Sequence, residues 1–123
     1  MITAVGIDLV EIERIRRALE RHSGRFLERC FHPEELTWLD GRLDPAPGLA
    51  ARFAAKEAFQ KCWPAPLGWK DAWVVKEGPR PSLRLAQRLA LELAAGGLSV
   101  HLSLTHARSH AAAVVVIERT VRP

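Results

Sequence analysis

The fold of this chain is decided by residues 50–63, which read A-A-R-F-A-A-K-E-A-F-Q-K-C-W. Drawn as an α-helix, the stretch gathers small and apolar side chains at i, i+3, i+4, i+7, i+8 and i+11 of one face: Ala51, Ala54, Ala55, Ala58, Phe59 and Cys62. Alanine has the highest intrinsic helix propensity, and its short side chain lets a neighbouring backbone approach closely. We therefore predict a long helix whose alanine-rich face is buried.

The opposite face of this predicted helix carries Phe53, Lys56, Glu57, Gln60 and Lys61. Glu57 and Lys61 are spaced i, i+4 and can form a common helix ion pair, worth roughly 0.2 to 0.5 kcal/mol. A carboxylate held between ammonium groups on a rigid helix can also bind a metal ion and phosphates. The helix alone leaves both interpretations open.

Length and composition indicate one globular domain, residues 1–123, because 48% of the residues are hydrophobic and 26% are charged. No apolar run approaches the ~20 residues of a membrane helix, and no signal-like segment opens the sequence, so we expect a cytoplasmic protein. Cys30 and Cys62 lack metal-ligand spacing and are predicted to be reduced thiols, with Cys62 in the core. The net charge of +4 favours a polyanionic partner: nucleic acid, a phosphate-rich cofactor or an acidic protein.

Hydrophobic periodicity and turn residues predict the other elements of an α+β domain. Strands are expected at residues 3–10, 72–76, 82–85, 99–105 and 111–117. Helices are expected at residues 10–22, from His32 to near Gly41, and at 84–95, with Gly24 ending the first of them. The last two strands are predicted to form a β-hairpin, whose apolar second strand suits a central position buried on both faces.

Asp8 is the unusual residue of the first predicted strand, because a buried aspartate is costly unless it is paired, hydrogen-bonded or bound to a cation. It either caps the following helix, with Glu11 at i+3 completing a capping-box pattern, or binds a cation. That helix then presents Arg14, Arg17 and Arg21 along one face. They form either a solvated face, with Glu13 paired to Arg17, or a docking surface for phosphates or an acidic helix.

The connection of the predicted hairpin reads H-A-R-S-H, residues 106–110, and places two imidazoles and a guanidinium at a strand end. It is either an ordinary polar loop or an anion-binding site.

Three segments together carry a family resemblance. They read V-G-I-D-L-V-E-I-E-R-I (residues 5–15), R-F-A-A-K-E-A-F-Q-K (52–61), and L-S-L-T-H (102–106) followed by A-A-A-V-V-V-I-E (111–118). In this order and at this length they resemble the holo-acyl-carrier-protein synthases, the small stand-alone 4′-phosphopantetheinyl transferases. The resemblance implies that family's fold, an antiparallel sheet packed against a long central helix. It also implies a homotrimer with active sites between subunits.

The resemblance implies Mg²⁺-dependent transfer of 4′-phosphopantetheine from coenzyme A to a serine of apo acyl carrier protein, for fatty acid synthesis, with release of adenosine 3′,5′-bisphosphate. Asp8 and Glu57 would bind Mg²⁺, which usually takes one or two carboxylates and completes its shell with phosphate and water. The expected phosphate contacts of coenzyme A are Arg52, Lys56, Lys61 and His106, with Lys56 equally able to be a structural partner of Glu57. Lys61 would offset charge that develops during transfer.

The resemblance leaves two candidates for the general base that the acceptor serine needs: Glu57 through a metal-bound water, or His106. Arg14 looks like a contact to the acidic recognition helix of the carrier protein, and Arg17 and Arg21 extend that surface by geometry.

The chain departs from the family pattern in two places. Residues 62–66, C-W-P-A-P, replace a Gly-Thr-Gly-like turn, so backbone N–H contacts to phosphate from this loop are not expected, since proline has none. Ala107 follows the histidine of the last motif, where the family often has a polar or acidic residue.

Two other functions are compatible with the basic charge. A nucleic-acid-binding domain would need exposed aromatic residues for base stacking, yet tyrosine is absent and no aromatic residue is interleaved with the arginine face. A non-catalytic carrier-protein adaptor would not need Asp8, Glu57 and Lys61 together. We therefore expect coenzyme A and apo acyl carrier protein as partners, with no nucleic acid and no membrane.

Overall fold

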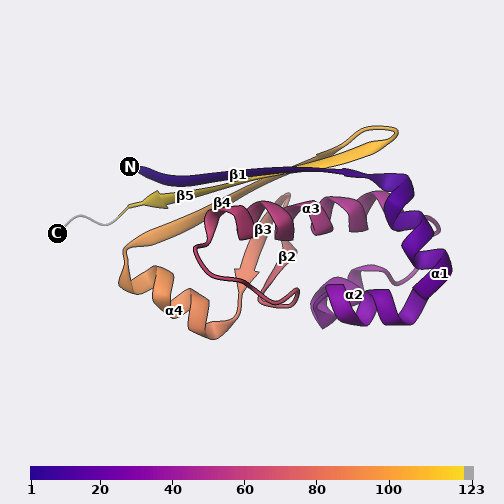
Figure 1. Ribbon diagram of the computed structural model, residues 1–123, viewed down its shortest axis with the longest axis horizontal. Helices are drawn as coiled ribbons and strands as arrows, with labels where there is room; N and C mark the ends of the chain where they lie inside the picture. The colour runs from indigo at the N-terminus through magenta and orange to yellow at the C-terminus, as the bar shows by residue number, and fades with distance from the viewer. Residues whose placement is uncertain (121–123) are drawn as a thin grey trace.

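The computed structural model describes residues 1–120, apart from the side chain of Ser23. Its elements follow in the order β1 (Ile2–Glu11), α1 (Ile12–Cys30), α2 (Pro33–Trp38), α3 (Ala46–Cys62), β2 (Ala72–Glu77), β3 (Arg80–Leu85), α4 (Gln87–Ala95), β4 (Leu98–His106) and β5 (His110–Arg119). A three-stranded antiparallel sheet has the strand order β1-β5-β4, and β2 and β3 form a separate hairpin (Figure 1). The α+β class, the antiparallel sheet and the long central helix are as predicted.

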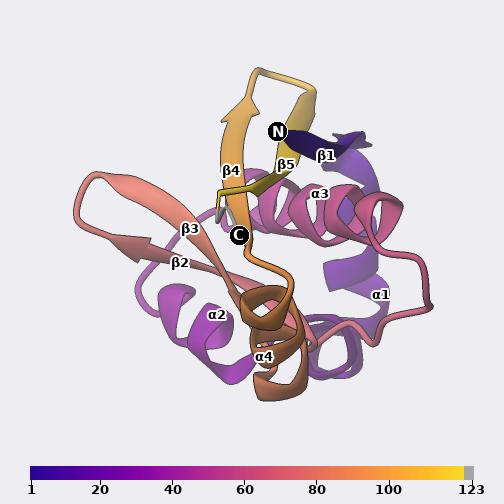
Figure 2. The same cartoon turned by 90° about the vertical axis from the view of Figure 1, so that its left-hand side faces the viewer.

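Helix α3 runs along one face of the β1-β5-β4 sheet and forms the centre of the core (Figures 1 and 2). Its alanine-rich face is buried as predicted: Ala54, Ala55 and Ala58 are 0% exposed. Gly6 of β1 lies directly against this face, and a Cβ atom there would overlap the carbonyl oxygen of Ala58. The strand backbone and the helix backbone therefore meet with no side chain between them.

No helix of the described residues covers the other face of the three-stranded sheet (Figures 1 and 2). Along β1 it exposes Val5, Ile7 and Leu9, at 61%, 61% and 66% of their surface. Strand β5 is central, as predicted, but its burial alternates along the strand: Ala111, Ala113, Val115 and Ile117 are buried, and the residues between them are only half-buried. The prediction that β5 is buried on both faces is therefore wrong for the single chain, because no element within residues 1–120 covers the outer face.

Helix α1 does not end at Gly24 as predicted, but continues to Cys30. The continuation carries Phe26, whose ring packs against Phe31 at 5.7 Å and against Phe53 at 6.4 Å. This packing offsets the roughly 1 kcal/mol that glycine costs within a helix. Asp8 does not cap α1, since the N-cap is Glu11, which makes no side-chain capping bond.

A second face of α3 is also buried, because α1, α2 and the loop after α3 cover it. Phe53, predicted on the polar face, is 7% exposed and stacks on Trp69 at 4.8 Å. Both cysteines are free thiols, as predicted, but Cys30 is the buried one. Cys62 lies on the last turn of α3, where the sheet covers it only in part, so it is half-buried.

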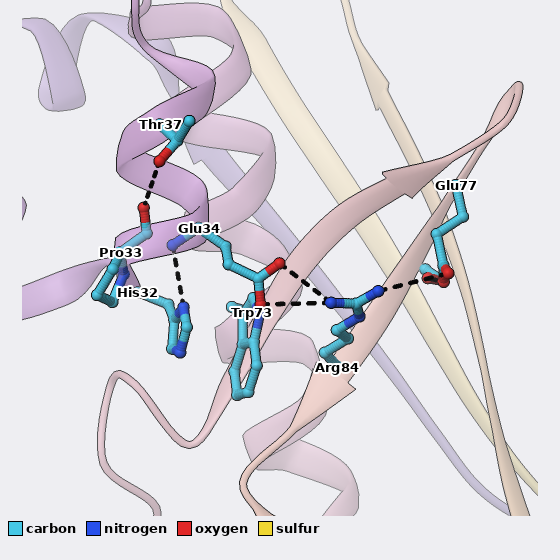
Figure 3. A network of polar contacts seen from close by, with 8 residues as sticks. His32, Pro33, Glu34, Thr37, Trp73, Glu77 and Arg84 are labelled. Carbon is cyan, nitrogen blue, oxygen red and sulfur yellow. Dashed lines mark hydrogen bonds and ion pairs between the residues drawn. The ribbon is translucent and has the colours of Figure 1, made fainter.

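The β2-β3 hairpin is fastened to the start of α2 by a polar network (Figure 3). Glu34 accepts hydrogen bonds from the indole N–H of Trp73 at 3.0 Å and from Arg84 at 3.1 Å. The imidazole of His32 stacks on Trp73 at 3.8 Å and caps α2 by accepting the N–H of Glu34 at its Nδ1. The hairpin is therefore held in a defined position beside α2.

The backbone contact between β1 and α3 predicts opposite effects for two glycine-to-alanine substitutions. Gly6→Ala forces β1 away from Ala58 and is expected to reduce the free energy of unfolding by about 1 to 3 kcal/mol. Gly24→Ala is the matched control, because a Cβ atom there meets nothing within 4 Å and gains helix propensity of about 1 kcal/mol. Urea unfolding followed by circular dichroism measures both values. A Gly6→Ala protein as stable as the wild type would contradict the close approach.

Candidate functional site

Asp8 and Lys61 meet where β1 crosses the last turns of α3. The Lys61 Nζ donates to the backbone oxygen of Ile7 at 2.8 Å and to the Asp8 carboxylate at 3.3 Å. The Asp8 side chain is 18% exposed, whereas that of Lys61 is 54% exposed. The carboxylate therefore lies in the crevice between strand and helix, and the ammonium group approaches it from solvent.

Glu57 lies one helical turn before Lys61, yet the two do not form the i, i+4 ion pair that the sequence allows. Lys61 reaches β1 instead, and Glu57 has neither an ion-pair nor a hydrogen-bond partner among residues 1–120. Because Gly6 contacts Ala58, the segment of β1 that carries Asp8 lies over the part of α3 that carries Glu57. The two carboxylates thus come from the segments of β1 and α3 that meet here, which we call the Asp8–Glu57 edge; Glu57 also lines a pocket with Gln60 and Trp69.

The oxygen donors of this edge suit a hard divalent cation. The described residues contain no cluster of three or more histidine, cysteine or acidic side chains, so a Zn²⁺-type site has no basis in residues 1–120. Mg²⁺ requires less from the protein, commonly one or two carboxylates, because water and substrate phosphate supply the other oxygens. Asp8 and Glu57, one of them free of any partner within residues 1–120, fit that requirement.

A second site lies at the other end of α3, where a pocket of about 400 Å³ opens between α2, α3, the β2-β3 hairpin and the end of β4. Its cationic and imidazole side chains are Arg42, Arg52, Lys76 and His106. The structure therefore brings together Arg52 and His106, which the sequence analysis named as phosphate contacts from separate motifs. Arg42 and Lys76 were missed, because nothing in the local sequence pattern indicates that they face this pocket.

Arg52 is 6% exposed although it lines the pocket, and its Nε atom is buried without a hydrogen-bond partner in the described chain. One terminal nitrogen donates to the backbone oxygen of Gly48 at 3.3 Å. Burial lowers the pKa of Arg52; the carboxylate of Glu35 opposes this shift, and the charge of Arg42 adds to it. A buried guanidinium with an unused donor is a suitable partner for an anion, since an unmade buried hydrogen bond is costly.

Lys56 does not occupy the position predicted for a coenzyme A contact. It is 6% exposed, and its Nζ donates to the backbone oxygens of Trp69 at 2.9 Å and Ala72 at 2.7 Å. Its third partner is the carboxylate of Glu35, at 2.7 Å. All the donors of the ammonium group are used, so none is left for a phosphate. The prediction of a phosphate contact is therefore corrected, because Lys56 faces inward, under the loop that follows α3.

Glu35 is a residue whose importance the sequence analysis missed. It is 0% exposed and also accepts the backbone N–H groups of His32 and Val74. Burial lowers the pKa of Lys56, and the adjacent carboxylate opposes that shift. The sequence shows Glu35 only as an acidic residue in the first turn of a helix, and its burial depends on α3 and β2, which are distant along the chain.

The loop that replaces the expected glycine-rich turn is held by the side chain of Gln60. Its amide donates to the backbone oxygen of Ala65 at 3.0 Å and accepts the N–H of Leu67 at 2.8 Å. The next N–H, of Gly68, bonds to Asp71 at 2.7 Å, and a hydrogen bond from Arg88 lowers the pKa of this carboxyl group. Pro64 and Pro66 have no N–H, and those of Trp63, Leu67 and Gly68 are used within the protein.

The predicted docking residues Arg14, Arg17 and Arg21 are exposed on α1 and line one shallow hollow on its surface. Glu13 pairs with Arg16 at 2.8 Å, and not with Arg17 as the solvated-face interpretation assumed. None of the three docking arginines has an acidic partner in the part of the chain that the structure describes.

No helix among residues 1–120 is long and apolar enough to cross a membrane.

Comparisons with known proteins agree on one family. The sequence profile of the 4′-phosphopantetheinyl transferase superfamily matches residues 4–115. A holo-[acyl-carrier-protein] synthase of Thermus thermophilus is 57% identical over 122 residues, which cover 99% of this chain and 98% of that protein.

Two solved structures extend the similarity to the fold. The holo-[acyl-carrier-protein] synthase of Neisseria meningitidis has a TM-score of 0.86 at 31% identity, covering 96% of this chain and 99% of its own. The enzyme of Bacillus anthracis in complex with coenzyme A (3′,5′-ADP) has a TM-score of 0.81 at 29% identity, with coverage of 98% and 99%.

The buried Glu35–Lys56 pair predicts that Lys56→Met destabilises the protein in the absence of any ligand. Removing the cation leaves Glu35 buried without its partner, which costs about 3 to 5 kcal/mol. Lys70→Met, at an exposed lysine, is the control and is expected to change stability by less than about 0.5 kcal/mol. Urea unfolding without coenzyme A provides the measurement. Equal stability of the two variants would make Lys56 a candidate substrate contact again.

Proposed function

We propose that magnesium, the diphosphate of coenzyme A and the acceptor serine meet at the Asp8–Glu57 edge of α3. The chain belongs to the holo-[acyl-carrier-protein] synthase family of 4′-phosphopantetheinyl transferases. The chain transfers phosphopantetheine from coenzyme A to acyl carrier protein. The observation that best supports this position is the contact of Lys61 with Asp8, which leaves the carboxylate of Glu57 without a partner among residues 1–120.

Asp8 and Glu57 are the proposed protein ligands of Mg²⁺. When bound, the metal neutralises negative charge on the diphosphate of coenzyme A. Lys61 contacts the Asp8 carboxylate and is proposed to supply a further positive charge to the bridging oxygens. Its contact with the Ile7 backbone oxygen keeps the ammonium group at the crevice, so the charge is in place before the substrate arrives.

In the transfer itself the serine oxygen bonds to the phosphorus that carries the pantetheine arm. The bridging P–O bond breaks, and adenosine 3′,5′-bisphosphate leaves with the bridging oxygen. The serine proton must pass to a base, and Glu57 and His106 are the two groups proposed for this role.

The pocket around Arg52 is the proposed site of the 3′-phosphate of coenzyme A. Its support is the buried, unused Nε of Arg52 together with His106 at the mouth. Guanidinium groups bind phosphate well because their planar N–H donors match its oxygens. Lys56 is proposed to fix this part of α3 through its buried ion pair with Glu35, without contacting the substrate.

The exposed arginine face of α1 is the proposed docking surface for the carrier protein. Arg14, Arg17 and Arg21 line one hollow and have no acidic partner among residues 1–120. Such a surface attracts an acidic helix over a distance and speeds its association.

The assembly is proposed to be a homotrimer with active sites between subunits. Val5, Ile7 and Leu9 form an apolar strip on the open face of the sheet, which is unfavourable in water. Burying this strip against other copies of the chain removes that cost. It also places a second subunit near the Asp8–Glu57 edge, since Asp8 belongs to the same strand.

The activity is tested by mixing the protein with apo acyl carrier protein, coenzyme A and Mg²⁺ and measuring the intact mass of the carrier. The expected result is a gain of one phosphopantetheine group, lost on removal of Mg²⁺. Asp8→Asn and Glu57→Gln are expected to reduce turnover at least about 100-fold without unfolding the protein, because each removes a metal-bound charge.

Glu92→Gln, at an exposed acid of α4, is the control and should keep wild-type turnover. No mass gain with several apo carriers would refute the transferase activity. Tight binding of DNA or RNA in the same samples would favour the nucleic-acid alternative, and tight carrier binding without transfer would favour the adaptor.

The open sheet face predicts the oligomeric state. Sedimentation velocity at micromolar concentration should give a trimer for the wild type and a smaller species for Ile7→Lys, because the substitution places a charge in the apolar interface. Leu91→Lys is a matched control, since Leu91 is 62% exposed on α4, away from the sheet. A monomeric wild type, or an unchanged Ile7→Lys protein, would be inconsistent with this interface.

A further inference from the structure

Trp38 lies at the end of α2 and forms one wall of the pocket around Arg52. We propose that Trp38 is a positioning residue that orients the guanidinium of Arg52 toward the 3′-phosphate of coenzyme A. The proposal rests on the phosphate site proposed above and deepens it, because it identifies the side chain that prepares Arg52 for its ligand.

The first observation is the stacking of Arg52 on the indole. The guanidinium carbon lies 3.9 Å from the centroid of the Trp38 ring. Stacking fixes the plane of the guanidinium and leaves its N–H groups, which lie in that plane, free to bond elsewhere. One of them donates to Gly48, while the Nε atom has no partner within residues 1–120. The indole thus constrains the group without using its donors.

The second observation concerns the position of the indole itself. Gly48 lies one turn before Arg52 on α3, and a Cβ atom at this position would overlap the six-membered ring of Trp38. The ring therefore rests directly on the helix backbone at the turn from which Arg52 projects. Because Gly48 also accepts the hydrogen bond of Arg52, the three residues form one packed unit.

The third observation is a second cation at the same ring. The guanidinium carbon of Arg42 also lies 3.9 Å from the Trp38 centroid, and its Nε donates to the Trp38 backbone oxygen at 2.8 Å. Neither Arg42 nor Arg52 has a salt-bridge partner in the described part of the chain. The π-electrons of one indole partly offset two neighbouring positive charges, which leaves them available to a doubly charged anion such as a phosphate monoester.

A purely structural role for Trp38 makes a different prediction from a positioning role. If the indole only fills space, its loss weakens the fold and affects every substrate alike. If it orients Arg52, its loss weakens binding only where the 3′-phosphate is present. Comparing coenzyme A with 3′-dephospho-coenzyme A separates the two roles, since the substrates differ only in that group.

The experiment measures KM and kcat for both substrates with the wild type and with Trp38→Leu and Trp38→Phe. For Trp38→Leu we expect the KM for coenzyme A to rise about tenfold, the scale of a desolvated cation–π contact. Its kcat, and its KM for the dephospho substrate, should stay within about twofold of wild type. Trp38→Phe retains an aromatic face and should recover most of the affinity. Trp38→Met, flexible and apolar, replaces Trp38→Leu if that variant does not fold.

Trp73→Leu is the matched control, because Trp73 also packs at α2, on His32, but does not line the pocket. It should leave the ratio of the two KM values at its wild-type level, whatever its effect on the thermal midpoint. A Trp38→Leu protein that keeps the wild-type ratio would overturn the proposal while leaving the transferase activity intact. A wild type without any preference for coenzyme A over the dephospho substrate would overturn both the phosphate site and the role of Trp38. A wild type without transfer would instead refute the proposed function.

Discussion

The close contact between Gly6 of β1 and Ala58 of α3 is the constraint on which the site depends. A strand and a helix normally keep side chains between them, but here a glycine meets an alanine-rich face and the backbones touch. At this separation the ammonium group of Lys61 can reach a backbone oxygen and a carboxylate of β1. The small residues at this contact therefore set the distance between the charged groups. A larger residue in place of Gly6 or Ala58 would separate Asp8 from Lys61.

A buried ion pair provides the second fixed point of α3. The Lys56 ammonium joins α2, α3 and the start of β2 through Glu35 and two backbone oxygens. Such a pair contributes little net stability compared with apolar packing, but a broken pair is very costly, so it favours one arrangement of the three elements. Glu57 is the next residue along the helix, and its direction follows from that of Lys56. The polar edge and the buried face of α3 are thus two consequences of one helix orientation.

The features that local sequence predicts are those set by periodicity. The alanine face of α3, the terminal hairpin and the central place of β5 follow from repeats of 3.6 and 2 residues, and the structure agrees. The burial of Arg52 and Lys56 could not be predicted, because it depends on Trp38 and Glu35 from another element. The end of α1 was misplaced for a similar reason, since contacts of Phe26 across the core outweigh the local signal of Gly24. Arg52 and His106, which come from separate motifs, line one pocket, whereas Lys56 of the same helix motif faces inward. The positions of Arg42 and Trp38 in that pocket could not be predicted from local sequence.

The loop after α3 has a consequence for how this protein responds to salt. Many phosphate sites use backbone N–H groups, whose dipoles act at short range and are little affected by dissolved ions. Here the N–H groups of Leu67 and Gly68 are used on Gln60 and Asp71, and prolines remove others, so our proposal assigns phosphate binding chiefly to charged side chains. Attraction between such charges is screened over about 8 to 10 Å at physiological ionic strength. The affinity of this protein for coenzyme A should therefore fall steeply as ionic strength rises, more so than in a protein with a glycine-rich turn at this position.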